Sequence, residues 1–136
     1  MSTEMARNSW GVILDHEEDG ILDLRWLSST AAMTDDQFKE TLELFAGQAE
    51  QAQRPFLLID ATEFLHAFGQ GVMEWRDREI IPRYNAAGTS KFAFLVPEGF
   101  PDAMEMGGQP MTDGPATFPT AWFIDRRHAL DWFRGD

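Results

Sequence analysis

The sequence predicts an α/β domain with a mixed, mostly parallel sheet of four to five strands, an N-terminal antiparallel hairpin and three to four helices. The main observation is an unbroken apolar run over residues 56–59, opened by Pro55 and closed by Asp60. Such a run is typical of a central strand that is buried on both faces. Helical periodicity before and after it indicates crossover helices. Asp19-Gly20, between two apolar-rich runs, indicates a hairpin turn.

The N-terminal part is predicted to hold this hairpin and the first helix. Residues 1–9 are polar and are expected to form a loose terminus, followed by strands over 10–16 and 21–27. Thr34 and Gln37 have the spacing of a capping box, in which each side chain binds the backbone N–H of the other residue. A one-sided apolar stripe follows and predicts a helix that continues almost to the central strand.

The C-terminal part is predicted to complete the sheet. A helix over 71–87 should be kinked or split by Pro82, which lacks a backbone donor. Its charged residues are assigned to the solvent-facing side, namely Glu74, Arg76, Asp77, Arg78, Glu79 and Arg83. The remaining predicted elements are a strand over 91–97, a long Gly-, Pro- and Met-rich loop over 98–119 with a short helix at 101–106, a strand over 120–124 and a helix capped by Asp125.

Composition limits the kinds of function. A chain of 136 residues is expected to form one domain, 1–136. The absence of Cys excludes disulfides and thiolate metal sites, and the net charge of −12 argues against a nucleic-acid partner. No apolar run has the length of a transmembrane segment and no signal-peptide pattern is present, so a cytoplasmic location is expected. No motif for a cofactor or a metal is found.

Several short segments resemble the STAS fold of anti-sigma-factor antagonists, and more closely the small bacterial SpoIIAA-like (STAS/SEC14-like) proteins. The resemblance runs from about residue 10 to residue 133. It rests on Leu57-Leu58-Ile59-Asp60-Ala61, Lys91-Phe92-Ala93-Phe94-Leu95, Phe123-Ile124-Asp125 and Ala129-Leu130-Asp131-Trp132-Phe133. It implies a STAS-like α/β fold, and the similarity to SEC14-like proteins implies lipid or other apolar ligands.

The resemblance also implies a candidate phosphoacceptor. STAS regulators carry an Asp-Ser-Ser-Gly-like sequence after the central strand, where a partner kinase phosphorylates a hydroxyl. Asp60-Ala61-Thr62-Glu63 stands in that place here, which makes Thr62 the candidate. Glu63 replaces the Gly and would repel a phosphate, and residues 64–71 separate the hydroxyl from the next helix. The alternative role for Thr62 is that of a turn or capping residue.

Besides a phosphoregulated switch at Thr62, a second hypothesis is that the protein is a small enzyme. Asp60, Glu63 and His66 follow the central strand, and a His beside a carboxylate can act as a general base. The sequence contains no nucleophile elbow and no Cys to complete a familiar constellation. The alternative for His66 is a loop residue that binds the backbone, so the sequence favours a non-enzymatic role.

The remaining hypotheses are binding functions. Aromatic and Met side chains near the end of the central strand are expected to line an apolar groove, where Met adapts to varied ligands. The hypotheses are a small apolar or lipid-like ligand, a regulatory protein partner, and a homodimer, since Trp is enriched at interfaces. The candidate ligand- or partner-binding residues are Asp60, Thr62, Glu63, Phe64, His66, Phe68, Trp75, Met104 and Met106.

Overall fold

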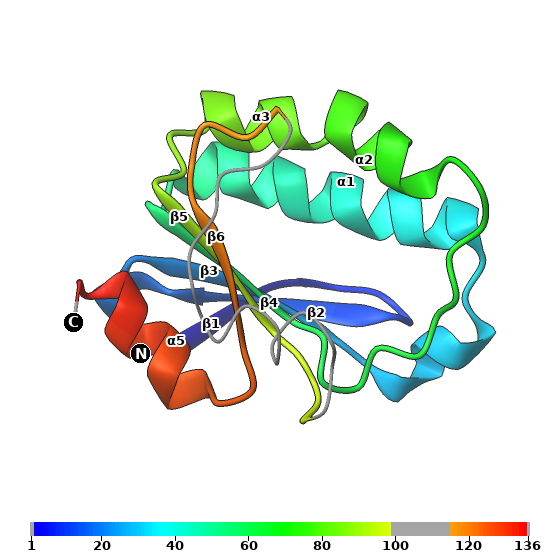
Figure 1. Ribbon diagram of the computed structural model, residues 1–136, viewed down its shortest axis with the longest axis horizontal. Helices are drawn as coiled ribbons and strands as arrows, with labels where there is room; N and C mark the ends of the chain where they lie inside the picture. The colour runs from blue at the N-terminus through cyan, green and yellow to red at the C-terminus, as the bar shows by residue number, and fades with distance from the viewer. Residues whose placement is uncertain (1, 99–114, 136) are drawn as a thin grey trace.

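The computed structural model describes residues 2–98 and 115–135. Over these residues the chain is an α/β domain with a six-stranded mixed sheet (Figure 1). The strands are β1 (Ser2–Arg7), β2 (Gly11–His16), β3 (Ile21–Trp26), β4 (Phe56–Asp60), β5 (Lys91–Leu95) and β6 (Thr120–Phe123). The α-helices within the described residues are α1 (Asp35–Ala52), α2 (Val72–Glu79), α3 (Ile81–Ala86) and α5 (Arg126–Phe133).

The strands lie side by side in the order in which they occur along the chain. β1, β2 and β3 pair in antiparallel fashion, and β3, β4, β5 and β6 pair in parallel. Each parallel pair needs a crossover connection. α1 makes the crossover between β3 and β4, and α2 with α3 makes the one between β4 and β5. The mixed, mostly parallel sheet with its N-terminal hairpin is confirmed.

The predicted loose N-terminus is wrong, and this accounts for the extra strand. Residues 2–7 form the edge strand β1, in which Ser2 lies opposite His16 and Arg7 lies opposite Val12. Almost all of its side chains are exposed, so it has no apolar alternation that would mark it as a strand. β1 is a strand because its backbone completes the hydrogen bonds of β2 at the sheet edge.

Helices cover both faces of the sheet. Figure 1 shows α1, α2 and α3 above the sheet and α5 below it. Successive side chains of a strand point to opposite faces. In β4, Leu57 and Ile59 join the core between the sheet and α1–α3, and Leu58 joins the core between the sheet and α5. All three are buried. The predicted central strand is therefore confirmed, because apolar layers enclose it on both sides.

Local signals set the ends of several elements. The capping box of α1 is present, with Thr34 Oγ1 accepting from Gln37 N–H (3.2 Å) and Gln37 Oε1 accepting from Thr34 N–H (2.9 Å). Asp125 caps α5 as predicted. At the hairpin turn Gly20 has a φ of +70°, a conformation that other residues rarely adopt. A Cβ there would also lie 3.3 Å from Pro55 Cγ.

The helix predicted over 71–87 is split, as expected from its proline. α2 ends at Glu79, and Pro82 occupies the first turn of α3, where its missing N–H is tolerated. Asn85 of α3 then binds the chain at residues 115–117, donating to Pro115 O (2.8 Å) and accepting from Thr117 N–H (2.9 Å). This contact fixes the described end of the predicted loop, and Phe118 packs in the core. The short helix predicted at 101–106 lies outside the described residues.

Asp15 and Arg54 generate a prediction about stability. Arg54, just after α1, donates Nε and Nη2 hydrogen bonds to the two carboxylate oxygens of Asp15 on β2, both at 2.9 Å. These bonds hold the pKa of Asp15 below its usual value. A lowered pKa means that the stabilisation is complete above the unfolded pKa of about 4 and is lost as the pH falls through the folded pKa. Asp15→Asn should lower the free energy of unfolding by about 1–3 kcal/mol at neutral pH.

The measurement is urea unfolding of both proteins from pH 7 down to pH 3. The difference between wild type and Asp15→Asn should shrink below about pH 4. Glu40→Gln is the matched control, because Glu40 is exposed on α1 and its change alters the net charge equally. A loss of stability that is the same for both variants at neutral pH would contradict the role of the Arg54 pair.

Candidate functional site

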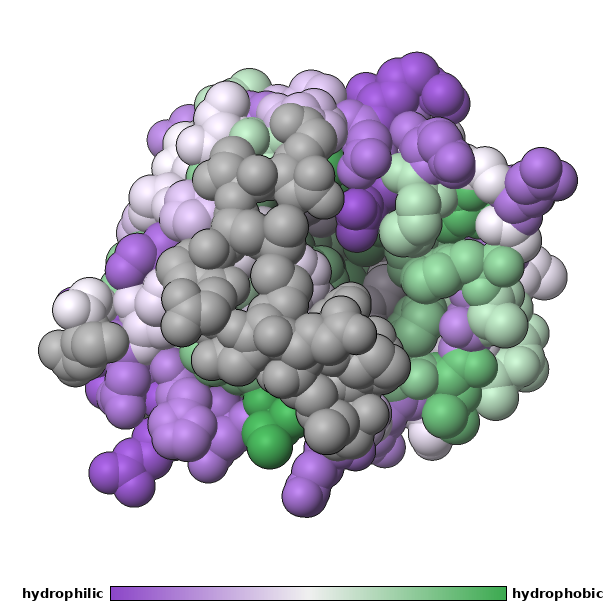
Figure 2. Space-filling view, viewed as in Figure 1, coloured by the Kyte–Doolittle hydropathy of each residue, from purple (hydrophilic) through white to green (hydrophobic). Residues whose placement is uncertain are grey.

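An apolar cavity of about 620 Å³ lies between the sheet and the helices α1–α3. Its volume is within the range of roughly 300–1,000 Å³ of pockets that hold small organic ligands. Figure 2 shows this side of the molecule hollowed, with hydrophobic residues gathered beside the hollow. Most of the cavity wall is aromatic or aliphatic, and the polar exceptions include His66, Arg76, Asp77, Tyr84 and Thr120.

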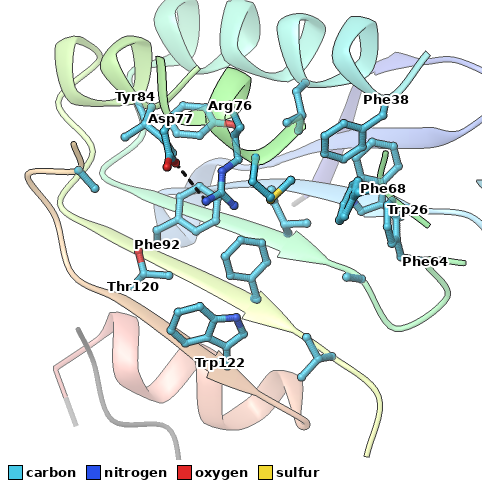
Figure 3. A pocket seen from close by; sticks show the side chains of 18 of the residues that line it. Trp26, Phe38, Phe64, Phe68, Arg76, Asp77, Tyr84, Phe92, Thr120 and Trp122 are labelled. Atoms are coloured by element: carbon cyan, nitrogen blue, oxygen red, sulfur yellow. Dashed lines mark hydrogen bonds and ion pairs between the residues drawn. The ribbon is translucent and has the colours of Figure 1, made fainter. Parts of the chain in front are cut away.

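Aromatic rings form one end of the cavity. Trp26 of β3 stacks on Phe38 of α1 with ring centroids 5.5 Å apart. Phe64 meets the edge of Trp26 at 5.1 Å, and Phe68 meets Phe38 at 4.8 Å. Figure 3 shows these four side chains together on one side of the cavity. Phe64 and Phe68 were both predicted to belong to the binding site. The segment between β4 and α2 places them against Trp26 of β3 and Phe38 of α1.

The start of α1 holds this segment in place. His66 Nε2 donates to Asp35 Oδ1 (2.7 Å), and the Gly69 N–H donates to both carboxylate oxygens at 3.1 and 3.2 Å. Leu65 N–H donates to Thr30 Oγ1 (2.8 Å). The His66 bond and then the Gly69 bond lower the pKa of Asp35, so it stays ionised. A Cβ at Gly69 would collide with Asp35 Oδ2, so a larger residue there would force the Asp35 side chain to shift.

Polar groups gather at the other end of the cavity. Tyr84 of α3 is almost completely buried, and its hydroxyl has no hydrogen-bond partner among the described residues. Arg76 of α2 donates from Nη2 to Asp77 Oδ1 (3.2 Å), whereas its Nε is buried and unpartnered within the same residues. Figure 3 shows these three residues opposite the aromatic cluster. The cavity therefore has an apolar end and an end with unused hydrogen-bonding groups.

Asp60 and Thr62 belong to a different network, which joins the carboxyl end of β4 to the start of α5. Thr62 Oγ1 donates to Asp60 Oδ1 (2.6 Å), as does the Thr62 N–H (3.1 Å). Arg126 of α5 donates to Asp60 Oδ2 (3.0 Å) and to Asp23 Oδ2 (3.2 Å). His16 of β2 also bonds to Asp23 (3.0 Å). In this arrangement Thr62 is an exposed turn residue whose hydroxyl binds the acid before it.

The predicted site residues thus divide into separate groups. Phe64, His66 and Phe68 line the cavity, whereas Asp60 and Thr62 join the α5 network. The carboxylate that bonds to His66 comes from Asp35 at the start of α1 rather than from Asp60 or Glu63. Glu63 is exposed. Trp75 packs at the margin of the core with Lys39 5.5 Å from its ring centroid, and the predicted Met104 and Met106 lie outside the described residues.

Arg76 and Asp77 were predicted on the solvent-facing side of their helix, but both line the cavity. The Arg76 side chain is about one-third exposed. The spacing contained the signal, since Arg76 comes four residues after Val72 and four before Ile80, both buried. Residues four apart lie on the same helix face. A charged residue within an inward-facing stripe therefore marked this end of the cavity.

The described residues do not add a metal site or a membrane span. Over 2–98 and 115–135, three or more His, Asp or Glu side chains are nowhere arranged to hold a metal ion. No helix in the described part of the chain is both long and apolar enough to cross a membrane. Comparison of the chain with protein-family models, curated proteins and solved structures gives no match. The cavity is therefore the feature from which we infer a function.

The Asp35 contacts generate a prediction about the segment between β4 and α2. Asp35→Ala should expose the amides of 64–69 to faster hydrogen exchange, because the segment loses its bonds from His66 and Gly69. Hydrogen–deuterium exchange with mass spectrometry measures this. Asp36→Ala is the matched control, since both acids lie in the first turn of α1 but only Asp35 bonds to the segment in the structure. Equal exchange in the two variants would contradict the contact.

Proposed function

We propose that this protein is a non-enzymatic, STAS-like domain that binds a small apolar molecule between its sheet and its α1–α3 layer. The observation that carries the proposal is the apolar cavity of about 620 Å³ with a few polar groups at one end. Protein interiors are close-packed and leave few voids larger than a water molecule. A mostly apolar cavity of ligand size, with a few polar groups that can orient a ligand, is the usual form of a small-molecule site.

The contacts of His66 and Thr62 give each residue a structural role, and the apolar lining of the cavity supports binding as the function. His66 bonds to Asp35 and supports the segment that carries Phe64 and Phe68. A phosphate on Thr62 would lie beside the carboxylate of Asp60, which would repel it. Binding of an apolar ligand would leave the hydrogen bonds of His66 and Thr62 as they are in the structure.

A regulatory protein partner is the second candidate, and one observation favours it. Leu65 and Phe68 are 60% and 44% exposed, and both belong to the segment that carries Phe64 to the cavity. Exposed apolar side chains next to a groove are common at protein–protein contacts. Native mass spectrometry of the freshly purified protein separates the candidates. A bound small molecule that is lost on denaturation supports the first, and a retained protein supports the second.

The cavity proposal predicts that filling the cavity weakens binding of a neutral apolar probe. Ala61 lines the cavity at the end of β4, and Ala61→Phe places a ring in the space. The affinity for the fluorescent probe N-phenylnaphthylamine should fall by about tenfold or more. The measurement is a fluorescence titration.

Ala86→Phe is the control for this titration, because Ala86 is exposed on α3 and does not line the cavity. It should leave the probe affinity unchanged. Circular dichroism checks that both variants are folded. If folded Ala61→Phe binds the probe as tightly as wild type does, the probe binds elsewhere and the cavity proposal fails.

A further inference from the structure

The hydroxyl of Tyr84 is a buried donor that the fold leaves unused. The residue is 1% exposed and lines the cavity, and among the described residues its oxygen has no hydrogen-bond partner. Burial raises the pKa of Tyr84, and the nearby guanidinium groups of Arg76 and Arg83 only partly offset this. The group is therefore a neutral O–H at all ordinary pH values. Buried polar groups without a partner are uncommon and need an explanation.

Arg76 supplies a second unused donor at the same end of the cavity. Its Nε is buried and has no partner in the described part of the chain, although Nη2 donates to Asp77 (3.2 Å). Figure 3 shows its side chain extending from α2 into the cavity, with Tyr84 and Asp77 beside it. An Arg side chain presents its donors in a fixed fork that matches the two oxygens of a carboxylate. Asp77 uses only one part of that fork.

The two donors define the chemistry of an acceptor. A carboxylate has two oxygens that only accept, so it can receive Arg76 Nε–H and the Tyr84 O–H together. A primary amine would meet a guanidinium of the same charge. A doubly charged phosphate would be repelled by the carboxylate of Asp77, which already pairs with Arg76. The ligand group that fits the Arg76 and Tyr84 donors therefore carries a single negative charge and two acceptor oxygens.

The rest of the cavity defines the body of the ligand. From Arg76 and Tyr84 the cavity extends to the ring cluster of Trp26, Phe38 and Phe68, where the His66 ring also lies, 5.5 Å from that of Phe68. The polar end and the aromatic end lie opposite each other in Figure 3. An elongated apolar body satisfies this shape, with its acid at one end.

We propose that the ligand is an apolar monocarboxylic acid whose carboxylate accepts hydrogen bonds from Arg76 and Tyr84 and whose apolar body extends toward the Trp26–Phe38–Phe68 cluster. This inference rests on the proposed function, because it names the class of molecule that the cavity holds. It assigns an acceptor to two buried donor atoms, the Tyr84 hydroxyl oxygen and Arg76 Nε, that have no partner among the described residues.

The test compares two probes of equal length, decanoate and decanol, as competitors of N-phenylnaphthylamine on the full chain. Decanoate should bind about tenfold or more tightly than decanol, because only the acid satisfies both donors with its two oxygens. Arg76→Gln should remove this preference. Arg78→Gln should keep it, since Arg78 lies on the same helix, carries the same charge and is exposed.

Tyr84→Phe provides a second variant that should fold normally. It deletes a hydroxyl without a partner in the described residues, so the ligand-free protein should be at least as stable as wild type in a thermal melt. Its preference for decanoate over decanol should fall by about threefold to tenfold. Decanol affinity should change little in both cavity variants, because the apolar body makes the same contacts.

The outcomes separate the two proposals. If the neutral probe and decanol bind in the cavity but decanoate shows no advantage, or if the advantage persists in folded Arg76→Gln, the carboxylate inference is overturned and the cavity proposal stands. If neither the probe nor either competitor binds, the proposed function itself fails. A preference that is lost in Arg76→Gln and kept in Arg78→Gln supports the inference.

Discussion

The burial of β4 on both faces is the constraint on which the rest of the molecule depends. Leu57 and Ile59 require an apolar layer on one side of the sheet, and Leu58 requires one on the other. Because β3, β4 and β5 are parallel, the two connections between them cross a face of the sheet. The crossovers α1 and α2–α3 supply the first layer, and the terminal helix α5 supplies the second. The carboxyl end of β4 then lies between the cavity on one side and the ion pairs of Arg126 on the other.

The cavity follows from how the first layer is attached. α1 packs on the sheet through a continuous stripe that includes Phe38, Leu42 and Phe45. The second crossover is interrupted, because its helix ends before Pro82 and starts again as α3. Wide aromatic rings from Trp26, Phe38 and Phe92 line the space between the layers. These rings meet in stacked or edge-to-face contacts, as Trp26 does with Phe38 and Phe64.

The sequence predicted the elements that are marked by strong local signals. The apolar run of β4, the capping box at Thr34 and the splitting effect of Pro82 each depend on residues close in the chain, and each is confirmed. β1 was missed because an edge strand with exposed side chains owes its conformation to its neighbour β2 rather than to its own pattern. Pairing across a sheet is a tertiary effect that local propensity does not report.

The candidate site was predictable in part, for the same reason. The aromatic residues after β4 were expected to line an apolar groove, and the structure brings Phe64 and Phe68 to the cavity. The partner of His66 was not predictable, because Asp35 lies 31 residues away in sequence and only the fold brings them together. Arg76 was misplaced because its charge was given more weight than its position between Val72 and Ile80. Because residues four apart lie on the same helix face, the buried neighbours Val72 and Ile80 place Arg76 on the inward-facing side despite its charge.

The proposed ligand class has to agree with the net charge of −12. The many surface carboxylates repel an anion, but ions screen charges over a Debye length of about 8 Å at physiological ionic strength. Inside the cavity the local dielectric is lower, so a guanidinium at hydrogen-bond distance outweighs distant surface charges. An acidic surface is therefore compatible with a cavity that binds an anion, because the cationic donor, Arg76, lines the cavity. The surface charge would then slow the approach of an acid at low ionic strength, while Arg76 and Tyr84 determine its retention.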